Sequence, residues 1–232
     1  MSLIRILPHL AAFVAVVLCA RLALWQFDRA EEKQALLDQW DNAEAAQISG
    51  EHLPELFAPV QARGRLDPER HVLLDNQTRN NHPGVHVFTP FRPEGSDLVF
   101  MVNRGWQPWN RREGELPSVN TPEGTLTISA RFSDIPRVGL QLGQTSPLDG
   151  EHWPNLMTYY DTQRIREVLG PEVVDGVLLL DPEHDAHFTG DPWPTVNIGP
   201  ERHQGYAFQW ISIGLAIITI WLVLTIRGLR KS

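Results

Sequence analysis

The chain has 232 residues, 42% hydrophobic and 21% charged, and this ordinary average conceals two dense apolar blocks near its ends. All 28 acidic residues lie between Asp28 and Glu201, whereas five of the 20 basic residues lie up to position 21 or after position 206. The segment between the blocks is therefore acidic, which excludes nucleic acid as a main partner because that affinity rests on Lys and Arg. The single cysteine, Cys19, excludes an intrachain disulfide.

The first apolar block, residues 6–24, predicts a transmembrane helix preceded by a cytoplasmic segment, residues 1–5. Pro8 falls in the first helical turn, where a missing N–H does little harm. The alternative is a cleaved signal peptide, with Arg5 in front of a short apolar core. Ala20-Arg21-Leu22-Ala23 has the wrong spacing for a cleavage site. An uncleaved anchor is therefore favoured.

Residues 25–47 contain no Gly or Pro and predict a helical extension of the anchor, and residues 48–203 predict a β-rich domain. Period-two or apolar segments bounded by turn residues predict strands at residues 60–66, 71–77, 85–91, 98–103, 125–132 and 177–181. We expect turns at Asp67-Pro68, Pro83-Gly84, Pro93-Glu94-Gly95 and Pro122-Glu123-Gly124. Asp161 as N-cap and Gly170-Pro171 as a stop predict one short helix.

The second apolar block, residues 207–226, has no charge and is about 30 Å long as a helix, enough to cross a bilayer core. Tyr206 and Trp210 lie at one end, and the basic residues of the segment 227–232 lie at the other. Positive charge beside both anchors predicts cytoplasmic termini and a periplasmic domain in a bacterial inner membrane. The fold class is thus a membrane-anchored α+β protein, in which two transmembrane helices flank a mostly antiparallel β domain.

The acidic domain offers little sign of enzyme chemistry. The sequence has no Gly-rich phosphate loop, no Gly-x-Ser-x-Gly and no His-Glu-x-x-His, so a hydrolase is disfavoured. His184 and His187 stand three apart among acidic residues, a pattern that could hold a metal ion. A solvated acidic loop explains the same pattern and is the preferred interpretation. His9 is expected to make a contact between the two helices.

His203 stands out because it precedes the second anchor by one turn. The predicted topology puts Trp25 and Arg29 of the first helix at the same depth, near Tyr206 and Trp210. An imidazole, a guanidinium and aromatic rings at a membrane surface suit a haem, with His203 on the iron and Arg29 on a propionate. The alternative is a cluster of interfacial anchors, which is common where helices leave a bilayer.

Five short motifs occur in order between the anchors and together resemble a known family. They are Trp25-Gln26-x-x-Arg29-x-x-x-Lys33, Arg63-Gly64-Arg65-Leu66-Asp67, Leu73-Leu74-Asp75-Asn76-Gln77-Thr78, Val102-Asn103-Arg104-Gly105-Trp106 and His203-x-x-Tyr206-Ala207-x-x-Trp210. The chain resembles the Surfeit locus protein 1 family of cytochrome c oxidase assembly factors, in a bacterial form. Gln204 departs from the Leu that commonly follows the histidine in that family.

The resemblance implies a non-enzymatic factor that aids insertion of haem a into subunit I of a haem-copper oxidase. It implies haem a as a transient cofactor and His203 as its iron ligand. Trp25, Arg29, Tyr206 and Trp210, at the same depth, are the pocket that we expect around it. The implied partners are subunit I, the enzymes of haem a synthesis and membrane lipid. The rival hypothesis is a scaffold that binds nascent oxidase subunits without haem, and a periplasmic metal carrier using His184 and His187 is a third. Trp106 and Trp109 are expected to be structural or to face a partner.

Overall fold

The computed structural model describes residues 3–136, 147–190 and 199–230. It divides into two compact units, one made of the two terminal segments and the other of residues 42–193.

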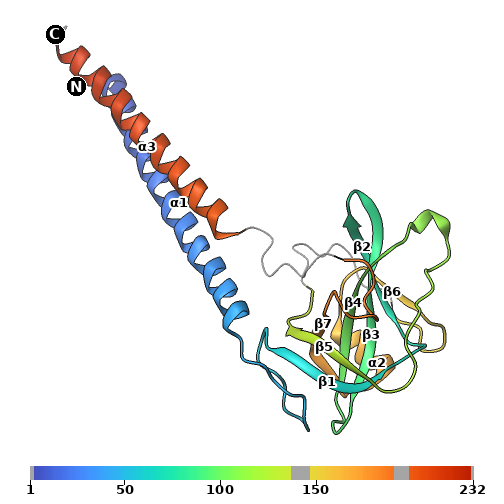
Figure 1. Ribbon diagram of the computed structural model, residues 1–232. Coiled ribbons are helices and arrows are strands. Elements are labelled where there is room, and N and C mark those ends of the chain that lie inside the picture. Colours follow the sequence, from blue (N-terminus) through green and yellow to red (C-terminus); the bar gives the residue numbers. More distant parts are fainter. Residues whose placement is uncertain (1–2, 137–146, 191–198, 231–232) are drawn as a thin grey trace. The chain divides into compact units, whose positions relative to one another are not determined.

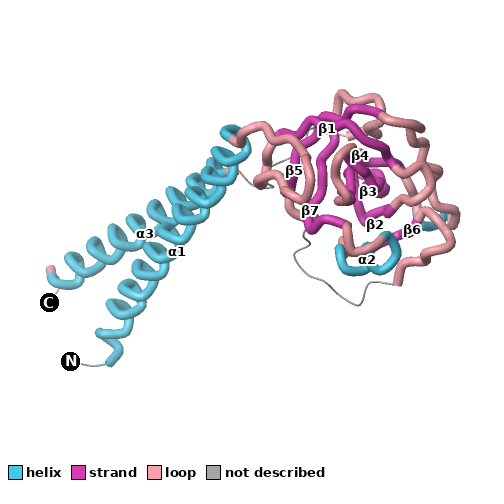
Figure 2. Tube along the Cα trace, turned by 90° about the horizontal axis from the view of Figure 1, so that it is seen from below, coloured by secondary structure: helices cyan, strands magenta, loops and turns pink. Residues whose placement is uncertain are grey.

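The first unit is an antiparallel pair of long helices, α1 (Leu3–Asn42) and α3 (Pro200–Leu229), which lie side by side in both views (Figures 1 and 2). Small buried residues at heptad-like spacing line the seam between them: Cys19, Ala23 and Ala30 on α1, and Ala207 and Gly214 on α3. Large apolar residues are exposed on both helices, and each helix contains a stretch of 18 residues with a mean hydropathy of 2.1, long and apolar enough to cross a membrane. The predicted pair of anchoring helices is confirmed as structure.

The helix α1 ends at Asn42, five residues before the predicted end at Gln47. The helix ends although no Gly or Pro follows, because the backbone just beyond it pairs with a strand. The Ala46 N–H donates to the Pro59 carbonyl over 2.8 Å, which places Ala46 beside the first strand.

The second unit is a closed β-barrel extended by two further strands (Figures 1 and 2). Its ring runs β1-β5-β7-β4-β3 and closes by pairing β1 with β3, while β2 and β6 continue outward from β3. Five of the strand pairings are antiparallel, and β4–β7 and β2–β6 are parallel, which confirms the mostly antiparallel domain. The strands are β1 (Pro59–Leu66), β2 (Val72–Arg79), β3 (His82–Pro93), β4 (Val99–Pro108), β5 (Leu126–Ser133), β6 (Asn155–Met157) and β7 (Val173–Leu180).

Gly64 explains how the ring can close. It pairs with Pro93 at the point where β1 meets β3. A Cβ on Gly64 would overlap the Arg92 carbonyl oxygen and lie 2.6 Å from Cζ of Phe91. Only glycine lets the two backbones approach this closely, and the buried Phe91 ring fills the barrel interior beside it.

The helix α2 (Thr162–Leu169) covers a second core on the barrel wall. Asp161 caps it by accepting hydrogen bonds from the N–H groups of Gln163 and Arg164, and Gly170 ends it, as predicted. Its buried face, Ile165 and Leu169, packs against apolar side chains of β2, β3, β4, β6 and β7. A short 3₁₀ turn, η1 (Arg111–Glu113), follows β4.

Two sequence-based expectations within the barrel are wrong. Pro83-Gly84 is not a turn but the start of β3, where the indole ring of Trp106 occupies the space that a Cβ on Gly84 would need. The hairpin turns instead at Asn80 and Asn81, both with positive φ, a conformation that Asn tolerates. The strand predicted at residues 98–103 likewise does not end at Asn103, since β4 continues to Pro108.

Candidate functional site

A hydrogen bond between the two helices anchors the candidate site at the seam. His203, in the first turn of α3, contacts the Gln26 Oε1 atom through its Nδ1, over 2.8 Å. Gln26 is only 8% exposed, although it is polar and lies on an apolar helix. Its position four residues before Ala30 and three after Ala23 places it on the buried stripe of α1.

A second hydrogen bond closes the seam at its other end. The Trp221 indole N–H donates to the Nδ1 atom of His9 over 2.7 Å, and the two rings meet edge to face. The expected helix–helix contact of His9 is therefore confirmed. From His203 to Trp221 is about 27 Å along α3 at 1.5 Å per residue. This is close to the roughly 30 Å hydrocarbon thickness of a bilayer, so each polar pair lies near one edge of the apolar span.

The other residues expected around His203 are distributed over two faces. Trp210 is half-buried and lies two turns from His203 on the same side of α3. Trp25 and Tyr206 are 48% and 51% exposed and lie on the outward faces, and Arg29 is exposed and pairs with Glu32 on its own helix. The structure thus brings His203, Trp210 and Gln26 to the seam and leaves Trp25, Arg29 and Tyr206 beside it.

The barrel contains a different polar site, a buried arginine in the middle of β4. Arg104 is 1% exposed and donates to the Ala186 carbonyl (2.8 Å), the Asn120 carbonyl (2.7 Å) and the Thr121 hydroxyl (2.6 Å). Its guanidinium also lies 4.7 Å from the centre of the Phe188 ring. Burial lowers the pKa of Arg104 to about 10, which still leaves the side chain charged at neutral pH.

Arg104 holds the segment that follows β7 against the barrel. The N–H of Phe188 donates to the Arg104 carbonyl over 2.6 Å, and the N–H of Trp106 donates to the Thr189 carbonyl over 2.8 Å. The His187 ring lies over Gly105, where a Cβ would come within 2.5 Å of its Cε1 atom. We call residues 184–190 the strap. Its attachment gives the Arg104 motif a structural role.

Burial lowers the pKa of three histidines of the barrel, His71, His86 and His187. Desolvation lowers the pKa of His71 to about 4, despite a hydrogen bond between its Nε2 and the Pro68 carbonyl oxygen. Desolvation, with repulsion from His187, likewise lowers the pKa of His86 to about 4. The pKa of His187 is lowered by the same burial. These rings serve the interior of the fold.

His184 does not offer its ring to a metal ion. Its Nε2 atom contacts the Thr127 carbonyl oxygen (3.0 Å), and its Nδ1 atom accepts from the Ala186 N–H (3.0 Å). Across the described ranges, no group of three or more His, Cys, Asp or Glu side chains has an arrangement that could hold a metal ion. The strap is a loop in which Asp185, like Glu183 just before it, is exposed, as expected, while its backbone and histidine rings contact the barrel.

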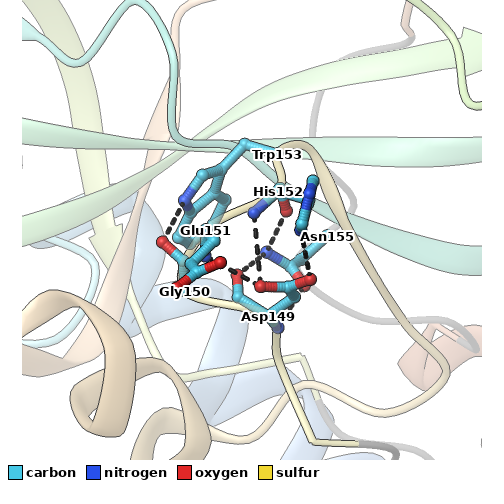
Figure 3. Close-up of polar contacts among 6 residues, drawn as sticks. All are labelled: Asp149, Gly150, Glu151, His152, Trp153 and Asn155. Atoms are coloured by element: carbon cyan, nitrogen blue, oxygen red, sulfur yellow. Dashed lines mark hydrogen bonds and ion pairs between the residues drawn. The ribbon is translucent and has the colours of Figure 1, made fainter.

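One exposed His–Asp pair resembles catalytic machinery but is a turn (Figure 3). His152 Nδ1 lies 2.7 Å from the Asp149 carboxylate, which also accepts the N–H groups of Glu151 and His152. Asn155 closes the turn through the Asp149 backbone, and its own N–H donates to the His71 carbonyl. This turn places β6 beside β2. Sequence patterns did not predict β6.

The two tryptophans that follow Gly105 have structural roles. Trp106 is buried and donates its indole N–H to the Gln77 carbonyl over 2.8 Å. Trp109 is also buried and donates to the Glu115 carbonyl over 2.8 Å. Both rings thus tie β4 and the chain after it to neighbouring segments.

Along the sequence, a closed β-barrel lies between two helices that are long and apolar enough to cross a membrane. This order is that of a membrane-anchored protein with one compact β domain. The model of the SURF1 family matches residues 13–215, and the chain belongs to this family, the one that its motifs resemble. A SURF1-like protein of Caenorhabditis elegans is 28% identical over 75% of this chain and 54% of its own length. Those of Caenorhabditis briggsae and Drosophila melanogaster are 26% and 25% identical, over 75% and 62% of this chain. The chain spans about half the length of these curated relatives.

Proposed function

We propose that this chain is a non-enzymatic assembly factor for a haem-copper (cytochrome c) oxidase, which holds haem a transiently and aids its delivery to subunit I. Membership of the SURF1 family, which is associated with cytochrome c oxidase assembly, supports the oxidase as the target. In this proposal the barrel contacts oxidase subunits or the enzymes of haem a synthesis. The chain sits in a bacterial inner membrane with cytoplasmic termini, as the basic residues beside both apolar blocks favour.

The observation that carries the haem proposal is the state of His203. Its Nδ1 is engaged by Gln26, and in the described part of the chain its Nε2 has no hydrogen-bond partner. The ring is half-buried at one edge of the apolar span, where an amphipathic macrocycle can keep its ring in lipid and its propionates in water. Trp210, on the same face of α3 as His203, offers an apolar surface to the macrocycle. Arg29 lies one helical turn after Gln26, and in this proposal its side chain exchanges Glu32 for a propionate.

The test is the haem content of the detergent-purified protein from cells that synthesise haem a. We expect the pyridine haemochrome spectrum to show haem a in wild type and little in His203→Ala at equal protein. His9→Ala is the matched control, because it removes the other seam histidine and should retain haem a. Absence of haem a in every sample would contradict the carrier proposal, and equal haem a in wild type and His203→Ala would move the ligand elsewhere.

A second candidate function is a scaffold that binds nascent oxidase subunits without haem. The observation in its favour is that His203 and His9 each make one hydrogen bond between the helices, at the two ends of one seam, as pure helix-pairing contacts would. The two functions differ in one outcome. His203→Ala should leave oxidase maturation intact if the chain is only a scaffold.

A further inference from the structure

The two histidines of the seam face opposite hydrogen-bonding partners. At His9 the partner is the Trp221 indole N–H, which can only donate, so Nδ1 of His9 accepts and the ring proton lies on Nε2. At His203 the partner atom is the Oε1 oxygen of Gln26, which can only accept, so Nδ1 of His203 must carry the proton. The seam therefore holds its two imidazoles in opposite tautomers.

We propose that Gln26 is a positioning residue, which fixes His203 in the tautomer that leaves the Nε2 lone pair available to a metal ion. The inference rests on the proposed function, since it assigns a role to that lone pair. A neutral imidazole has one ring proton and one lone pair. The proton on Nδ1 leaves the lone pair on Nε2, across the ring from Gln26. Fixing the ring through its other nitrogen is how proteins orient histidine ligands and raise their basicity.

The packing around Gln26 explains why this hydrogen bond persists. Gln26 is buried between two alanines of its own helix, Ala23 and Ala30, and Ala207 of α3 is completely buried one turn beyond His203. These small side chains let the helices approach closely and leave the amide little access to water. In such surroundings an unmade hydrogen bond is costly, so the amide oxygen keeps its contact with the imidazole.

The sequence supplies a matched comparison for this role. The hydrogen bonds at His203 and at His9 have similar lengths, 2.8 and 2.7 Å, and both join α1 to α3. Trp221→Phe thus removes a hydrogen bond between the helices without changing the surroundings of His203. Gln26→Met removes the acceptor at similar volume, and Gln26→Glu restores an acceptor at the same place.

The first measurement is the tautomer of His203 in the full chain, without haem, in lipid nanodiscs. Nitrogen NMR of the protein labelled with ¹⁵N in histidine alone separates protonated from unprotonated ring nitrogens, and His203→Ala and His9→Ala assign the two rings by subtraction. We expect the proton on Nδ1 at His203 and on Nε2 at His9. Gln26→Met should turn His203 into a mixture, Gln26→Glu should keep the proton on Nδ1, and Trp221→Phe should change His9 alone.

The second measurement is the affinity for ferric haem a, titrated into the same proteins. We expect Gln26→Met to weaken binding about 10- to 100-fold, the usual effect of removing a group that orients a metal ligand. Gln26→Glu and Trp221→Phe should bind within a few-fold of wild type.

Three results would overturn the inference or the function beneath it. A wild-type His203 protonated on Nε2, or an unchanged tautomer and affinity in Gln26→Met, would show that Gln26 does not position the ligand. His203→Ala that binds haem a as tightly as wild type would instead refute the proposed function, whatever the tautomer. The two failures are therefore distinguishable in the same set of proteins.

Discussion

The helix pair and the barrel bury apolar side chains of different size. In the barrel the large apolar residues are inside: Phe88, Phe91 and Phe100 are completely buried. In the helix pair, Phe13, Phe208 and Leu224 are more than 60% exposed, whereas Gln26 is buried on the seam. Large apolar residues are thus buried in one unit and exposed in the other. A fold in water buries its large apolar side chains, whereas a helix pair suited to lipid exposes them and packs small residues at its seam, here with Gln26 among them.

The comparison also concerns how polar groups inside each unit are satisfied. Arg104 in the barrel donates to acceptors on three separate segments, which are Thr89 of β3, residues 120–121 and Ala186 of the strap, so a single side chain organises its surroundings. The seam instead has isolated pairs, one at each end, between stretches of small residues. Arg104 thus joins several segments at one point, whereas one hydrogen bond at each end joins the two helices.

The largest expected effect is a cross-link that tests the seam directly. An ideal Cβ on Gly214 lies 3.5 Å from Cβ of Cys19, within the range for disulfides. Gly214→Cys should therefore form a nearly quantitative intrachain disulfide on oxidation, measured by protection from a maleimide–polymer reagent and by the intact mass. Gly228→Cys is the control, since its Cβ would have no neighbour within 4 Å. Disulfide-linked dimers in place of the intrachain bond would break the assignment of α1 and α3 to one pair.

The next effect concerns the buried Arg104 of the barrel. Arg104→Met should destabilise the full chain by about 3–5 kcal/mol, because buried acceptors on three segments lose their donor at once. The measurement is the free energy of unfolding from the denaturant-induced change in near-ultraviolet circular dichroism, in detergent. The exposed Arg112→Met should change it by less than about 0.5 kcal/mol. Equal effects of the two substitutions would show that the buried guanidinium does not organise the barrel.

The smallest effect is a pH dependence confined to the barrel. His71 has a pKa of about 4 in the folded protein, against about 6.5 for an exposed histidine, so the unfolded chain binds more protons between these values. Its contribution to stability is complete above pH 6.5 and is lost as the pH falls through 4. His71→Asn should remove about 2–3 kcal/mol of the loss between pH 6.5 and 4, measured by denaturation at several pH values. The exposed His82→Asn should leave the slope unchanged.

Much of the fold could be predicted because its strongest patterns are local. The alternation along residues 60–66 and the cap at Asp161 each reflect interactions within a few residues. The strand β6 escaped prediction because its three residues are defined by pairing with β2, more than 80 positions earlier. Arg104 escaped for a related reason. A charge inside a strand is normally exposed, and only distant carbonyl groups make its burial tolerable.

The candidate site shows the same division between local and distant information. Topology alone placed His203 at the depth of Trp25 and Arg29 on α1, and the heptad-like spacing of Ala23, Gln26 and Ala30 was visible in the sequence. That spacing could have identified Gln26, rather than Trp25 or Arg29, as the residue on the seam. The contact between His203 and Gln26 depends on the rotation of both helices about their axes. Hydropathy does not predict this rotation, because it measures only how apolar a stretch is.

The place of β7 in the ring has a consequence for biosynthesis. It lies between β4 and β5, so the barrel cannot close until residue 180 has left the ribosome, and α1 has no partner until α3 follows. Both units therefore depend on contacts between early and late parts of the chain, a topology that folds slowly. During translation the nascent chain presents open strand edges and an unpaired helix, and it needs protection until its last segment is made.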